Sequence, residues 1–149
     1  MPGPIDPATL EHSSHPAQRA AALSARYASQ RNKSAWLELY AQDAVVEDPV
    51  GVSPLDPSGR GHRGREALSR FWDMVIGPGR MTYVIRESYP CADECANVWS
   101  LTNTLPGEVQ VTVDLVSIYK VNPDGRLAYM RAYWSYADVE HKLKAALGG

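Results

Sequence analysis

Residues 108–121, EVQVTVDLVSIYKV, form a long segment rich in β-branched side chains, which is typical of a strand. Three further strand candidates flank it: MTYVIRESY at 81–89, CANVWSLTNTL at 95–105 and LAYMRAYWSY at 127–136. The turn-forming groups LPGE (105–108) and NPDG (122–125) separate neighbouring candidates. Strands joined by such short connectors predict hairpins, and therefore an antiparallel sheet in the second half of the chain.

The first half of the chain has helical periodicity instead. Apolar residues recur at helical spacing in three segments, at 16–30, 32–40 and 65–76, and the GPG at 77–79 ends the third. Residues 51–64 hold too many glycines and prolines for regular structure, so a long loop is expected there. Helices followed by hairpin-linked strands predict an α+β domain. We expect the three helices to pack on the concave face of a curved sheet, forming a cone-shaped α+β barrel around an apolar pocket.

Composition limits the classes of partner. The chain has 149 residues, 44% of them hydrophobic, which suits one soluble domain. We expect a flexible N-terminal arm over residues 1–15 and a single domain over residues 16–149. The net charge of −2 provides no basic field for nucleic acid, and no apolar run approaches a membrane span. The first residues lack the pattern of a signal peptide, so the sequence predicts a cytoplasmic protein.

The stretch AVVEDPVG at 44–51 places two acids where a strand candidate ends at Pro49. Because side chains alternate along a strand, Val46 and Asp48 share one face and Glu47 lies on the other. Only one of the two acids can therefore face a pocket. Asp-Pro is also a common start of a turn, so Asp48 is either a surface residue or a group directed into a pocket.

The motifs of other chemistries are absent from the sequence. It contains no nucleophile elbow, phosphate-binding glycine loop, zinc-protease motif or dinucleotide fingerprint. Cys91 and Cys95 lack a second Cys or His pair, so neither a metal nor a cofactor is expected. Carboxylates, hydroxyls and phenols remain as the reactive groups of any pocket. Such groups serve proton transfer, or simple binding, without a cofactor.

Three segments carry a family resemblance: LYAQDAVVEDPVG, GREALSRFWD and VDLVSIYKVNPDGRLAYMRAYWSYADV. Together they resemble the ketosteroid isomerase (steroid Δ5-isomerase) branch of the SnoaL-like, nuclear-transport-factor-2-like superfamily, over about residues 24–140. The loop at 52–64 departs from the compact bacterial isomerases and is more similar to a diverged actinobacterial subset. The resemblance implies a cone of three helices on a curved, mostly antiparallel sheet, with the ligand inside, and a homodimer.

The resemblance also implies roles for individual residues. Asp48 falls on the family's catalytic base, which moves a proton along a conjugated system next to a carbonyl, while a tyrosine and a protonated aspartate bind the carbonyl oxygen. Ser117 stands where the family has that aspartate. The tyrosine position falls on Ser24 when counted without a gap from Asp48, and Tyr27 lies one turn further on. Either a small deletion brings Tyr27 into register as the donor, or the donor differs.

The expected wall and the possible functions follow from the same resemblance. Four side chains fall on positions that line or support the family's steroid site, although plain core packing would explain each of them equally well: Tyr40, Trp72, Met130 and Trp134. The leading hypothesis is a steroid Δ-isomerase-like enzyme acting on a 3-oxo steroid or similar polycyclic ketone, with Asp48 as base and with Tyr27 and Ser117 as weakened donors. The alternatives are a polyketide cyclase or epoxide-opening cyclase or hydrolase, and a non-catalytic binding protein for a small hydrophobic ligand.

Overall fold

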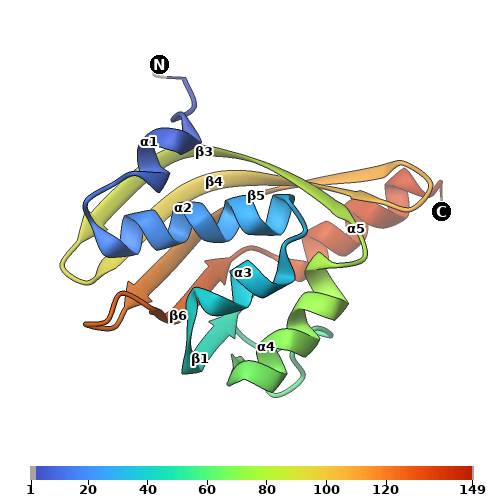
Figure 1. The fold of residues 1–149 in the computed structure, drawn as a ribbon. Helices are drawn as coiled ribbons and strands as arrows, with labels where there is room; N and C mark the ends of the chain where they lie inside the picture. Colours follow the sequence, from blue (N-terminus) through green and yellow to red (C-terminus); the bar gives the residue numbers. More distant parts are fainter. Residues whose placement is uncertain (1–2, 149) are drawn as a thin grey trace.

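A curved, open sheet of six strands forms the centre of the protein, which we describe from a computed structural model covering residues 3–148 (Figure 1). The strands lie in the order β2-β1-β6-β5-β4-β3. All neighbours are antiparallel except β1 and β6, which are parallel. The strands are β1 (Tyr40–Glu47), β2 (His62–Arg63), β3 (Arg80–Cys91), β4 (Glu94–Leu105), β5 (Val109–Val121) and β6 (Leu127–Tyr133). The predicted α+β fold with a mostly antiparallel sheet is confirmed.

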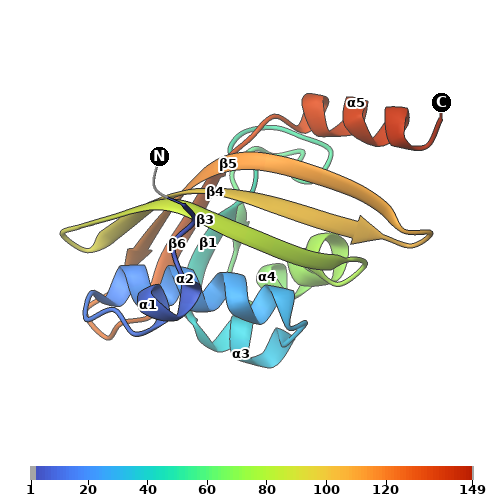
Figure 2. The same ribbon diagram turned by 90° about the horizontal axis from the view of Figure 1, so that it is seen from above.

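Helices cover one side of this sheet, as Figure 2 shows for α2, α3 and α4. The helices are α1 (Pro7–Glu11), α2 (Pro16–Ser29), α3 (Lys33–Glu38), α4 (Arg65–Phe71), the π-helical turn η1 (Trp72–Ile76) and α5 (Tyr136–Ala146). Asn32 caps α3 by accepting a hydrogen bond from the Ala35 amide. The three expected helices are therefore present, and α1 and α5 are additional to them.

Small residues set how closely α2 approaches the sheet. The buried face of α2 is made mainly of alanines, at positions 17, 20, 21, 22 and 25, together with Ser24. Tyr27, near the end of α2, is only partly buried and packs against the edge of the core. A helix with an alanine face can lie close to a sheet, because no long side chains separate their backbones.

The N-terminal segment and the second helix differ in detail from the expectation. Residues 1–15 were expected to form a flexible arm, and among the described residues of this segment Pro7–Glu11 is helical and Leu10 is buried against Ile85. The Ile5 amide also donates to the Ile85 carbonyl, so a local apolar cluster holds this segment to β3. The second helix ends at Glu38 rather than continuing through Tyr40, which instead begins β1 and is fully buried.

The loop between β1 and α4 is partly ordered by the sheet. Its last residues form β2, which pairs with β1 through Val45 and Arg63. Gly61 adopts φ of +88° and lies against β1, where an added Cβ would come within 2.7 Å of Val45 Cγ1. The carboxylate of Asp56 accepts hydrogen bonds from the Gly61 amide and the Ser58 hydroxyl. The expected long loop is therefore present, and it carries Leu55 to the concave side of the sheet.

Candidate active site

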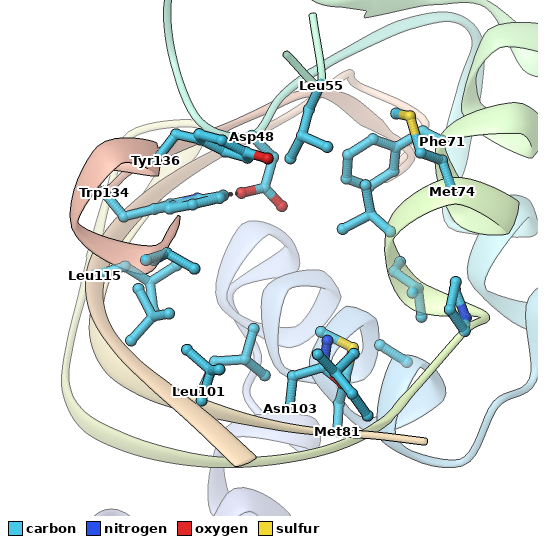
Figure 3. Close-up of a pocket in the computed structure, with 18 of the residues that line it drawn as sticks. Asp48, Leu55, Phe71, Met74, Met81, Leu101, Asn103, Leu115, Trp134 and Tyr136 are labelled. Atoms are coloured by element: carbon cyan, nitrogen blue, oxygen red, sulfur yellow. Dashed lines mark hydrogen bonds between the residues drawn. The ribbon is translucent and has the colours of Figure 1, made fainter. Parts of the chain in front are cut away.

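A cavity of about 540 Å³ lies between the concave face of the sheet, the helices and α5 (Figure 3). Odd-numbered residues of β4 and β5 form one wall, because alternate side chains of a strand point to the same face. The opposite side comes from α4 and η1, through Phe71, Met74 and Val75. Most of the lining is apolar. A cavity of this kind suits a small hydrophobic ligand held in place by a few polar groups.

Asp48 lies at one side of this cavity, immediately after β1. Parallel pairing of β1 with β6 places Glu47 beside Arg131, so the ends of the two strands leave the sheet together. Asp48 follows one end and Trp134 follows the other. The Trp134 indole donates a hydrogen bond from Nε1 to Asp48 Oδ1 at 2.5 Å, as Figure 3 shows. Of the two possibilities left by the sequence for Asp48, the structure has the pocket-facing one.

Burial raises the pKa of Asp48 from 3.8 to about 6, and the hydrogen bond from Trp134 opposes this shift. The carboxylate is surrounded by protein, although part of the side chain faces the cavity. Among residues 3–148, no Lys or Arg forms an ion pair with Asp48. Asp48 therefore ionises near the pH at which a general base works best.

Glu47 has the opposite environment. Its carboxylate accepts a hydrogen bond from Arg131 Nε at 2.7 Å, and the guanidinium of Arg131 lies 4.3 Å from the centre of the Tyr129 ring. The hydrogen bond that Arg131 donates to Glu47 raises the pKa of Arg131 further above its usual value. Glu47 is thus committed to an ion pair away from the cavity, as the alternation of β1 predicted.

Tyr119 is the buried phenol of the cavity. It lines the cavity from β5 and is only 3% exposed. Burial raises its pKa well above 10, and the nearby groups Tyr40 and Asp48 raise it further. The phenol therefore stays protonated and can donate a hydrogen bond. Tyr40 lies behind it, fully buried, with its hydroxyl 3.3 Å from Ser24 Oγ.

The two donors expected from the resemblance lie elsewhere. Ser117 is fully buried, accepts a hydrogen bond from Trp99 Nε1 at 2.9 Å and is not among the described residues that line the cavity. Tyr27 packs at the edge of the core and does not line the cavity either. Ser24 does line it, which agrees with the count from Asp48 without a gap. Ser24 and Tyr119 therefore line the cavity, whereas Tyr27 and Ser117 do not.

The four wall residues divide into two pairs. Met130 and Trp134 line the cavity. Tyr40 and Trp72 are 0% and 5% exposed and belong to the core behind it, where each packs on Trp36. Phe71, the neighbour of Trp72 in the chain, is buried and also forms part of the wall.

Several residues that line the cavity were not found from the sequence. Tyr119 is two residues beyond Ser117, and the alternation of a strand would have put both on one face. Trp99 stands opposite Leu115 in the β4–β5 register, which a sequence without known pairing cannot supply. Tyr136, from α5, packs beside Trp134 with 6.2 Å between ring centres. The sequence did not indicate this position, because the last strand candidate was taken to run as far as residue 136.

Within residues 3–148, no three His, Cys, Asp or Glu side chains come together as a possible metal site. In the same range, no helix is both long and apolar enough to cross a membrane. Proton transfer by Asp48, with the hydroxyls of Ser24 and Tyr119 in the same cavity, is a chemistry that the cavity residues themselves can supply.

Comparison with known families matches residues 20–130 to the SnoaL-like domain. A curated relative named Steroid Delta-isomerase, from Nocardioides simplex, is 31% identical over 101 residues, which cover 68% of this chain and 75% of the relative.

Solved structures show the same likeness. The Δ5-3-ketosteroid isomerase from Mycobacterium sp. superposes with a TM-score of 0.79 at 35% identity, over 84% of this chain and 96% of that one. A protein from Mycobacterium tuberculosis, solved in complex with estradiol-17beta-hemisuccinate, has a TM-score of 0.79 and 35% identity, over 85% of this chain and 98% of that one.

Proposed function

The chain belongs to the SnoaL-like domain family as a ketosteroid isomerase-like member, and from this premise we propose that it isomerises a 3-oxo steroid or a similar polycyclic ketone without a cofactor. The observation that carries the proposal is the carboxylate of Asp48, held by Trp134 in an apolar cavity and free of any ion pair within residues 3–148.

The proposed reaction moves one proton between two carbons of the substrate. Asp48 removes a proton from the carbon between the carbonyl and the isolated double bond, which leaves a dienolate. The same carboxyl group then returns the proton to the far carbon of the dienolate, giving a conjugated enone. No atom is gained or lost, and no electron acceptor is needed. A pKa of about 6 suits Asp48 to both steps, because it must accept and then release the proton.

Negative charge develops on the carbonyl oxygen during this transfer and needs a donor in a dry site. We assign this role to Tyr119, because it is buried, lines the cavity and remains protonated. Ser117, one of the expected donors, would then act indirectly. Its hydroxyl lowers the pKa of Tyr119 by hydrogen bonding and is itself fixed by Trp99.

Absorbance spectroscopy tests the proposed activity directly, since the conjugated enone absorbs ultraviolet light that the Δ5-3-ketosteroid does not. We expect the wild-type protein to convert the substrate far above the buffer rate. Tight binding of the steroid without conversion would instead identify a non-catalytic binding protein. If the protein neither binds nor converts the steroid, cyclisation or epoxide opening on the same fold becomes the function to test.

A pair of tyrosine variants tests the donor. Tyr119→Phe removes the buried hydroxyl, and we expect kcat to fall about 100-fold or more, in the range seen when one oxyanion donor is removed. Tyr136→Phe is the matched control, because Tyr136 is a more exposed phenol of the same cavity. A larger loss in Tyr136→Phe than in Tyr119→Phe would transfer the donor role to Tyr136.

The homodimer implied by the family resemblance stays a prediction. The outer face of the sheet offers an apolar area for a second copy, since Val116 and Tyr133 are paired in register and are 39% and 48% exposed. Light scattering would give twice the mass of 16.4 kDa for a dimer. We expect Val116→Asp to reduce that mass to the monomer value if this face is the interface.

A further inference from the structure

Asn103 is a polar side chain in an otherwise apolar part of the cavity wall. It lies on β4 between Leu101 and Leu105, and all three line the cavity. Its Oδ1 atom is buried and has no hydrogen-bond partner. A buried amide oxygen without a partner is destabilising, because it has lost its hydrogen bonds to water and gained none in the protein. The proposed proton transfer does not use this residue.

Asp48 and Asn103 lie on opposite sides of the cavity (Figure 3). The β4–β5 register gives a scale for their separation. Leu115, beside Trp134 in Figure 3, pairs with Trp99, whereas Asn103 pairs with Val111. Leu115 and Val111 are four residues apart on β5, which corresponds to about 13 Å of strand at roughly 3.3 Å per residue. The apolar wall between the two polar ends is thus about as long as a skeleton of four fused rings.

The structure holds the Asn103 amide in a defined place. A Cβ added to Gly79 would lie 2.1 Å from Asn103 Oδ1, so the amide occupies space that only glycine leaves free. The turn that contains Gly79 is fixed from outside, because Arg31 donates hydrogen bonds to the carbonyls of Gly79 and Gly77 at 2.8 and 3.0 Å. Rotation of the amide about its Cβ–Cγ bond exchanges oxygen and nitrogen, so the group can present either an acceptor or a donor to the cavity.

Charged groups near this part of the cavity do not replace Asn103. Glu140 and Lys144 of α5 also border the cavity, but their side chains are 48% and 69% exposed. They pair with each other at 3.7 Å. Their charges are therefore largely satisfied by one another and by solvent, whereas the Asn103 oxygen is not.

We propose that Asn103 recognises a hydroxyl or carbonyl group at the end of the ligand remote from the reacting ketone. This inference rests on the proposed function and specifies its substrate class: a rigid, largely apolar polycycle with an oxygen substituent at each end. One polar end meets Asp48 and Tyr119. The other accepts a hydrogen bond from the Asn103 amide nitrogen or, after the amide rotates, donates one to the oxygen, which in the present rotamer is packed against Gly79.

A matched pair of ligands tests the inference by equilibrium binding. Testosterone carries a 3-oxo group and a hydroxyl at the opposite end, and its 17-deoxy analogue lacks only that hydroxyl. We expect wild-type protein to bind testosterone about threefold to tenfold more tightly, the worth of one net hydrogen bond. In Asn103→Leu, which keeps a similar side-chain volume, the ratio of the two dissociation constants should fall to about one. Thr102→Val, on the outer face of the same strand, should keep the wild-type ratio.

The outcomes separate this inference from the proposed function. Equal affinity of the wild-type protein for the two ligands overturns the role of Asn103 and leaves the isomerase proposal standing. A preference that persists in Asn103→Leu also overturns that role. If neither ligand binds, the steroid class itself is wrong, and both proposals fail. The comparison of two ligands on the wild-type protein needs no variant to fold.

Discussion

Glu47 and Asp48 are neighbouring acids with opposite environments. Glu47 lies on the outer side of β1 and is paired with Arg131 at 2.7 Å. Asp48 lies in the cavity, where its partner is the neutral indole of Trp134. An acid that is paired with a guanidinium has its charge stabilised and makes a poor base. An acid that is buried without a cation has a raised pKa and can exchange a proton.

The difference arises from one residue of strand alternation. Successive side chains of β1 point to opposite faces, so a shift of one position exchanges an ion pair for a buried environment without a cation. The acid–base behaviour of these two carboxylates therefore depends on the face of β1 that each occupies and on its partners. Variants at the two positions can compare the two environments.

The largest effect is expected on turnover. Asp48→Asn keeps the shape and an acceptor for Trp134 but removes the base, so kcat for enone formation should fall by at least about 1,000-fold. Glu47→Gln removes one partner of an ion pair that lies outside the cavity, and turnover should stay within about twofold of wild type. The assignment of Asp48 would be lost if Asp48→Asn retained wild-type turnover.

The second effect concerns stability. Ionisation of Asp48 should raise activity but lower the free energy of unfolding. Between pH 3.8 and about 6 the folded protein retains on Asp48 a proton that the unfolded chain has released, so the free energy of unfolding decreases as pH rises through this window. At pH 8 the cost is at most about 3 kcal/mol, from two pKa units at about 1.4 kcal/mol each, and water in the cavity reduces it.

Asp48→Asn should therefore be more stable than wild type at pH 8, and this advantage should shrink towards pH 4. Urea unfolding at the two pH values measures the difference. Glu47→Gln should instead be unchanged or less stable by up to about 1 kcal/mol at pH 8, since it breaks a partly exposed ion pair. A destabilised Asp48→Asn at pH 8 would show that burial of the charge carries no cost.

The smallest effect is expected when the partner of Asp48 changes. The hydrogen bond from Trp134 lowers the pKa of Asp48, so Trp134→Phe should move the midpoint of the activity profile to higher pH. Turnover should fall severalfold at pH 7 and recover as pH increases. Tyr136→Phe alters the neighbouring ring without removing that hydrogen bond and should leave the midpoint in place. A downward shift in Trp134→Phe would contradict the proposed role of the indole.

Much of the fold was predictable because local patterns agree with the tertiary structure. Hairpin turns at 105–108 and 122–125 mark the strand boundaries, and alternation in β1 selects Asp48 over Glu47. The parallel pairing of β1 with β6 was not predictable, because it joins residues more than 80 positions apart. That pairing brings Trp134 to Asp48.

The hydroxyls of the cavity were harder to predict than the position of Asp48. Tyr27 is large and apolar enough to suggest the buried face of α2, but alanines occupy that face because the helix lies close to the sheet. Ser117 was placed on the correct strand, yet its hydroxyl is taken by Trp99 from the neighbouring strand. Tyr119 and Asn103 became visible only when register and cavity were known, since periodicity cannot distinguish a pocket wall from a core.

The pH dependence of kcat/KM for a Δ5-3-ketosteroid tests the central claim most directly, because it reports the ionisation of the base in the free enzyme. We expect a rise of about tenfold per pH unit below the midpoint, a midpoint near 6 and a plateau above it, in wild type and in Glu47→Gln alike. A midpoint near 4, or a profile that is flat between pH 4 and 8, would contradict a buried, unpaired Asp48 acting as the base.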